Sequence, residues 1–73
     1  MADSENILPQ IQNRVVLQAQ LALGPCTSRS IERREVVLNV RAFGVVRLTF
    51  SRRYDLPLNH YFWGCDRAER VSP

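Results

Sequence analysis

The stretch VVLNVRAFGVVRLTF, residues 36–50, carries the clearest structural signal in the chain. Polar residues such as Asn39, Arg47 and Thr49 occupy odd positions, whereas the even positions are apolar or small. This alternation is typical of a β-strand with one buried face, and the many β-branched residues agree with it. We expect the even-numbered set to face the core, namely Val36, Leu38, Val40, Ala42, Gly44, Val46, Leu48 and Phe50.

The same stretch is longer than a typical strand of about five or six residues. We therefore predict a hairpin that turns around residues 41–44, where Gly44 supplies the positive φ that a turn or bulge needs. One long bent strand is the alternative. Further along, residues 56–59 indicate a turn or an edge segment, and residues 60–68 a last short strand or helical turn.

Residues 10–24, QIQNRVVLQAQLALG, fit two templates. Six of the seven odd positions from 11 to 23 are apolar, which favours a strand. The Gln, Ala and Leu content and the final Gly24-Pro25 favour a helix, although Leu17 and Leu21 fall off its apolar face. We predict a strand, because period-2 order over this length rarely arises by accident.

The remaining segments connect or end these elements. Residues 1–9 are expected to form a flexible arm, ordered only if Ile7 and Leu8 meet a surface, and Gly24 and Pro25 open a loop. Residues 69–73 are expected to be a tail. The sequence therefore predicts a single small domain over residues 1–73. It is mainly β, with an antiparallel sheet of three to four strands, or α+β if residues 10–23 are helical.

The length of 73 residues limits the core. A folded chain of this size buries only about 60 % of the surface that its unfolded form exposes, so little margin remains over chain entropy. Cys26 and Cys65 form one disulfide at best. A small sheet also lacks an obvious layer to cover its apolar face. We therefore expect a homo-oligomer or a subunit of a larger complex, with a second copy or another protein as partner.

All ten basic residues are arginine, and the net charge is +3. The functional interpretation is recognition of phosphate or carboxylate, because a guanidinium offers a planar fork of donors. The alternative is a GC-rich genome, which replaces lysine codons without selection for function. Seven acidic residues are interspersed, so the signal for nucleic acid is modest.

Residues with catalytic or metal-binding chemistry are few. The available metal ligands are Cys26, Cys65, His60 and Asp66, and they lack the paired spacing of a structural zinc site. The chain has one histidine, no Gly-rich phosphate loop and little room for a water-excluding cleft. We therefore predict a non-enzymatic protein with no metal site and no cofactor.

The segment SRRYDLPLNHYFWGC, residues 51–65, combines arginines with four of the six aromatic residues. Tyr61, Phe62 and Trp63 are consecutive, so no regular conformation points all three into one core. Trp, Tyr and Arg are also the residues enriched at interface hot spots. The alternative is that Phe62 packs inward while Tyr61 and Trp63 cover the sheet edge. The predicted partner-binding residues are Tyr61, Phe62, Trp63, Arg52, Arg53 and Arg47.

The leading hypothesis is thus a small interaction protein. It would act as a subunit or stoichiometric inhibitor that docks on a larger assembly, for example one that handles nucleic acid. The rival hypothesis is a dimeric DNA- or RNA-binding protein that uses arginines on an open sheet face, with aromatic rings for base stacking. Its predicted contact residues are Arg41, Arg47, Arg53 and Tyr54. Alternatively, these arginines belong to a solvated face and pair with Glu32, Glu35 and Asp55.

The sequence does not favour a membrane location. No apolar run approaches the roughly 18 residues that span a bilayer, because Arg14, Gln18 and Gln20 interrupt the best candidate. The acidic first residues lack the basic-then-apolar order of a signal peptide. We expect a cytoplasmic protein with both thiols reduced.

Overall fold

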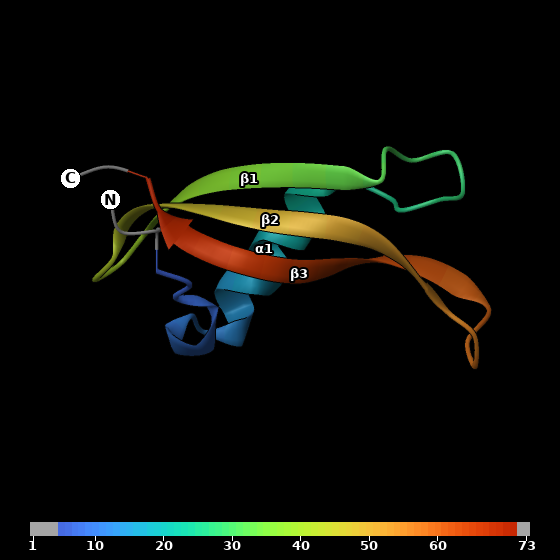
Figure 1. Ribbon diagram of the computed structural model, residues 1–73, viewed down its shortest axis with the longest axis horizontal. Coiled ribbons are helices and arrows are strands. Elements are labelled where there is room, and N and C mark those ends of the chain that lie inside the picture. The colour runs from blue at the N-terminus through green and yellow to red at the C-terminus, as the bar shows by residue number, and fades with distance from the viewer. Residues whose placement is uncertain (1–4, 72–73) are drawn as a thin grey trace.

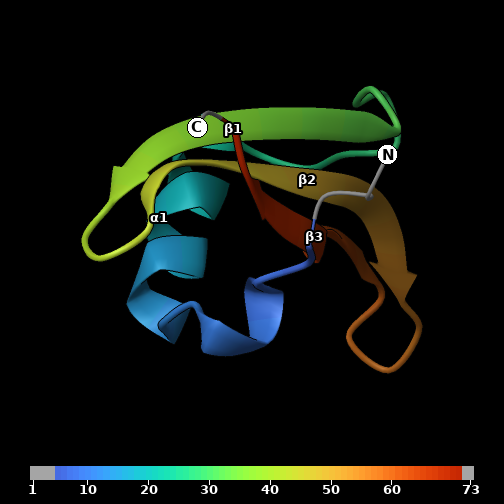
Figure 2. The same ribbon diagram turned by 60° about the vertical axis from the view of Figure 1, so that its left-hand side comes forward.

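The structure, a computed structural model, describes residues 5–71. Its elements are η1 (Leu8–Gln10), α1 (Asn13–Leu23), β1 (Arg33–Val40), β2 (Gly44–Asp55) and β3 (His60–Arg70). The strands form one antiparallel sheet in the order β1-β2-β3. Both helices lie on the same face of this sheet, and no described element covers the opposite face (Figure 1 and Figure 2). The mainly β fold with a small antiparallel sheet is thus confirmed.

The predicted hairpin around residues 41–44 joins β1 to β2. Val40 pairs with Gly44, and the N–H of Phe43 donates to the carbonyl of Val40 at 3.0 Å. Gly44 has the expected positive φ of 78°, and Ala42 also has a positive φ, of 76°. Because the register pairs even positions with even ones, the apolar sets of both strands share the face that packs against α1.

A second hairpin joins β2 to β3. Residues 56–59 form its turn, where the N–H of Asn59 donates to the carbonyl of Leu56 at 3.2 Å. Residues 60–68 are a strand, as one of the two predictions had it. The register shifts between Thr49 and Phe50, which leaves Asp66 as an extra residue on β3. Glu69 and Arg70, expected in a tail, belong to β3, and residues 72–73 lie outside the described part.

The strand predicted over residues 10–24 is wrong, because residues Asn13–Leu23 form the helix α1. The helix ends where Gly24 adopts a φ of 78° and donates its N–H to the carbonyl of Leu21 at 3.3 Å. The period-2 pattern misled because Leu17 and Leu21 are exposed, at 59 % and 83 %. One helix on a narrow sheet buries only a thin stripe, so apolar residues off that stripe imitate the alternation of a strand.

The segment before α1 packs against the outer edge of β3. The N–H of Ile7 donates to the carbonyl of Ala68 at 2.8 Å, and the N–H of Ala68 donates to Asn6 Oδ1 at 3.1 Å. Ile7 is buried and Leu8 packs against the core. The predicted arm therefore meets the condition for order from residue 5 onward, whereas residues 1–4 lie outside the described part.

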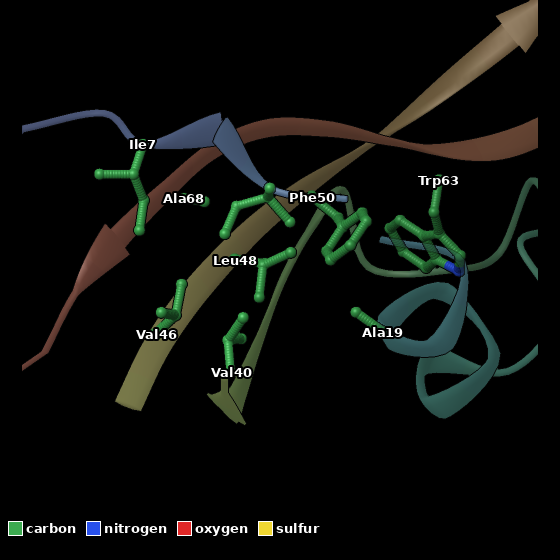
Figure 3. Close-up of a cluster of buried hydrophobic side chains, with 9 residues drawn as sticks. Ile7, Ala19, Val40, Val46, Leu48, Phe50, Trp63 and Ala68 are labelled. Carbon is green, nitrogen blue, oxygen red and sulfur yellow. The ribbon is translucent and has the colours of Figure 1, made fainter. Parts of the chain in front are cut away.

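The core is one layer of side chains between the sheet and the helices (Figure 3). Its three largest fully buried side chains, Val46, Leu48 and Phe50, all come from the central strand β2. Ala19 lies beside Trp63, and its small side chain lets α1 approach the sheet closely (Figure 3). The buried cluster contains Ile7, Ile11, Ala19, Val40, Val46, Leu48, Phe50, Trp63 and Ala68.

Candidate functional site

The consecutive aromatics of β3 are divided between the two faces of the sheet. Tyr61 pairs with Tyr54 and Trp63 pairs with Arg52, on the face that carries α1. Phe62 pairs with Arg53 on the opposite, open face and is 38 % exposed. The expectation that the three cannot share one core is met, with Phe62 outside rather than inside the helix-covered layer.

Trp63 joins the sheet to the end of α1. Its indole Nε1 donates to the carbonyl of Gly24 at 3.2 Å, and its own carbonyl accepts a hydrogen bond from Gln20 Nε2 at 2.7 Å. The side chain is 5 % exposed and lies against Ala19 (Figure 3). Trp63 was predicted as a partner contact, but the structure places it in the core, where it fixes the position of the helix.

An apolar groove lies beside Trp63, between α1 and the start of β3. Its volume is about 470 Å³, and most of the surface that it exposes is apolar. Leu17 and Leu21, one helical turn apart, form its helical wall and are among the most exposed apolar residues of the described chain. We call this site the docking groove; it is lined by Leu17, Gln20, Leu21, Gly24, Cys26, Tyr61, Phe62 and Trp63.

Tyr61 lines the docking groove, and Arg52 contacts its ring. The Arg52 guanidinium carbon lies 5.4 Å from the centre of the Tyr61 ring, a cation–π distance. Arg52 Nη1 donates to the carbonyl of Ser28 at 3.1 Å and also to that of Ser30. The Tyr61 ring meets the Tyr54 ring edge-on, with 5.0 Å between the ring centres. These contacts tie the loop after α1 to Arg52 and, through it, to Tyr61.

Both cysteines are free thiols. Burial raises the pKa of the Cys26 thiol above its ordinary value, and the nearby Arg52 charge opposes that rise. Burial is also the largest cause of the raised pKa of Cys65, which packs against the core. Because the thiolate is the nucleophilic form, a raised pKa lowers the fraction of each thiol in that form near neutral pH.

The arginines of the open face pair with acidic residues of β3. Arg47 Nε lies 3.4 Å from a carboxylate oxygen of Glu69, and Arg53 forms an ion pair with Asp66. Arg53 crosses Gly64 to reach that carboxylate, since a Cβ on Gly64 would lie 2.5 Å from Arg53 Nε. The alternative drawn from the sequence was that these arginines pair with Glu32, Glu35 and Asp55. The observed partners of Arg53 and Arg47 are instead Asp66 and Glu69.

The four residues predicted to contact nucleic acid do not form one surface. Arg47 and Arg53 share the open face, as their parity predicted, whereas Arg41 lies in the turn after β1. Tyr54 belongs to the helix-covered face, because it alternates with Arg53. The partner-binding set is divided as well. Tyr61 and Trp63 line the docking groove, and Arg52 contacts Tyr61. Phe62 pairs with Arg53 in the sheet and also lines the groove, while Arg47 and Arg53 lie on the open face.

Sequence reasoning missed Leu17, Leu21 and Cys26 as site residues. The signal was present, because Leu17 and Leu21 are the leucines that fall off the apolar face of the helix template. A leucine that lies off the apolar face of a helix is exposed unless something covers it, so it is a candidate contact residue.

Residues 5–71 contain no group of three or more His, Cys, Asp or Glu side chains placed to hold a metal ion. His60 is exposed at the start of β3, with its ring centre 6.4 Å from that of Phe62. In the same range, no helix has the length and apolar content that crossing a membrane requires. Comparison of the chain with protein family models, curated proteins and solved structures finds no match.

Proposed function

We propose that the protein is a non-enzymatic interaction module that docks on a larger protein through the docking groove. The observation that carries this proposal is the pair Leu17 and Leu21, which stand exposed on one wall of a preformed apolar groove. Scattered surface leucines are normal, but two beside an apolar hollow form a continuous patch. An apolar side chain of the partner is therefore the expected occupant.

The energetics favour a protein ligand. Full burial of an exposed leucine contributes about 1.5–3 kcal/mol, so covering Leu17 and Leu21 supplies a substantial part of a specific interface. Tyr61, which lines the groove, and Arg52, which contacts the Tyr61 ring, are of the residue types enriched in hot spots. Both are held in place by intramolecular contacts, so little side-chain freedom is lost on docking.

The proposal revises the predicted contact set. Arg52 and Tyr61 stay as direct contacts, and Leu17 and Leu21 join them. Trp63 is buried and acts through the shape of the groove. The small size suits a subunit or stoichiometric inhibitor of a larger assembly, as the sequence suggested.

The rival function, nucleic-acid binding on the open face, is less well supported. Its two face-sharing arginines, Arg47 and Arg53, already form ion pairs with Glu69 and Asp66, and Glu69 also pairs with Arg67. Phosphate contact would require these ion pairs to break or to be shared, which removes much of the electrostatic gain. A protein ligand at the docking groove does not incur that cost.

The test substitutes both groove leucines with serine and compares the partner recovered with each tagged protein from its native cells. Leu17→Ser with Leu21→Ser should abolish recovery of the partner seen with the wild type. Leu56→Ser is the matched control, since Leu56 is 76 % exposed and lies outside the groove. Both variants should unfold at the same urea concentration as the wild-type protein. Equal recovery with the double variant would contradict the proposal.

A further inference from the structure

The two outer edges of the sheet differ. The segment before α1 covers part of the β3 edge through Ile7, Asn6 and Ala68. β1 pairs only with β2, and within residues 5–71 no backbone hydrogen bond reaches its other edge. An unpaired strand edge presents a row of N–H and C=O groups that a further strand can bind.

A second groove lies between the N-terminal half of α1 and the end of β1. It has a volume of about 670 Å³. Arg14, Val15 and Gln18 of α1 face it from one side, and Leu38, Asn39 and Arg41 from the other. We call it the edge groove. A strand added to the outer edge of β1 would direct alternate side chains toward α1 and into this groove.

The charge of the edge groove selects the chemistry of such a strand. Its lining includes two arginines and four side-chain amides but no acidic residue. Arg14 and Arg41 are exposed and make no ion pair with any residue from 5 to 71. Carboxylates are the natural partners of these guanidinium groups, whose fork of donors matches two oxygens.

We propose that the outer edge of β1 binds an acidic peptide in extended conformation, which becomes a fourth strand of the sheet. Main-chain hydrogen bonds to β1 hold the peptide, and its inward carboxylates bind Arg14 and Arg41. The alternate side chains of the peptide point outward, away from α1. This site is independent of the docking groove, which lies at the other end of α1.

Two other occupants fit less well. A second copy pairing through its own β1 would bring Arg33 and Arg34 toward a groove that is already cationic. An oligonucleotide supplies negative charge but no peptide groups for the strand edge. The acidic peptide satisfies both the charge and the backbone.

The test uses a fluorescein-labelled peptide of eight residues, the length of β1, that alternates glutamate and valine. It should bind the whole protein at least about tenfold more tightly than the matched glutamine–valine peptide, because charge-assisted hydrogen bonds are the stronger ones. Arg14→Gln with Arg41→Gln should weaken binding about tenfold. Arg29→Gln, which removes an exposed loop arginine outside the groove, should leave it unchanged.

Hydrogen exchange locates the bound peptide. The β1 amides that point away from β2 should exchange more slowly when the glutamate–valine peptide is present. Equal affinity for the two peptides, no binding at all, or binding without slower exchange in β1 would each overturn the proposal. So would tighter binding of an oligothymidylate of equal charge, or a free dimer whose outward β1 amides are already protected.

Discussion

Two residues with positive φ, Ala42 and Gly44, define the first hairpin. Gly44 adopts this conformation without strain, whereas Ala42 adopts it at a cost of about 1–2 kcal/mol, because its Cβ crowds the backbone. The sequence indicated Gly44 from its type, but it gave no sign that Ala42 would be left-handed.

Substitution at these two positions should change stability in opposite directions. Gly44→Ala should lower the free energy of unfolding by about 1 kcal/mol, since the added Cβ meets no atom within 4 Å and only the backbone is strained. Ala42→Gly should raise it by about 0.5 kcal/mol, after the entropy of the unfolded glycine is subtracted. Urea unfolding measures both, and an equally stable Gly44→Ala variant would contradict the assigned backbone conformation.

The burial of the Cys65 thiol should be measurable as a slow rate of alkylation. Because burial raises its pKa, the native thiol should react with iodoacetamide more slowly than the same thiol in urea near neutral pH. The protonated form is the one favoured by the fold. The contribution of the protonated Cys65 thiol to the free energy of unfolding is therefore complete below the pKa of the unfolded state. It is lost as the pH rises through the higher pKa of the folded state. Equal rates in native and unfolded protein would argue against a buried Cys65.

The two hairpins and α1 show what local sequence determines. Alternation and Gly44 predict the β1–β2 hairpin, and the Leu56 to Asn59 turn is visible in its residue types. A strand was predicted where residues Asn13–Leu23 form a helix. The burial of each helical residue depends on a sheet whose strands come later in the chain, so the local pattern could not reveal it. The position of Trp63 depends on the same packing, so its role was also beyond local reasoning.

Trp63→Ala should therefore act on folding before it acts on docking. The substitution removes a buried indole and its hydrogen bond to the carbonyl of Gly24, and should lower the free energy of unfolding by about 3–5 kcal/mol. Such a loss is a large part of the total stability of a small domain. Leu56→Ala, at an exposed turn position, should change stability by less than about 0.5 kcal/mol in the same urea titration. An unchanged Trp63→Ala variant would make Trp63 a contact residue after all.

The whole molecule is a sheet with a helix on one side, and its shortest extent is 19 Å. That thickness corresponds to two layers, so a single layer of side chains forms the core. The sequence predicted the scarcity of core from length alone. It did not predict which surfaces remain, because the exposed leucines of α1 become a groove only where the helix end, the loop and β3 converge.

The most direct test of the docking groove is the reactivity of Cys26, which lines it. The complex with the partner is isolated from native cells, treated with iodoacetamide and compared by mass spectrometry with the free protein. We predict that alkylation of Cys26 is strongly slowed in the complex, while Cys65 reacts at the same rate in both samples. Alkylation of Cys26 at the same rate in the complex as in the free protein would contradict docking through this groove.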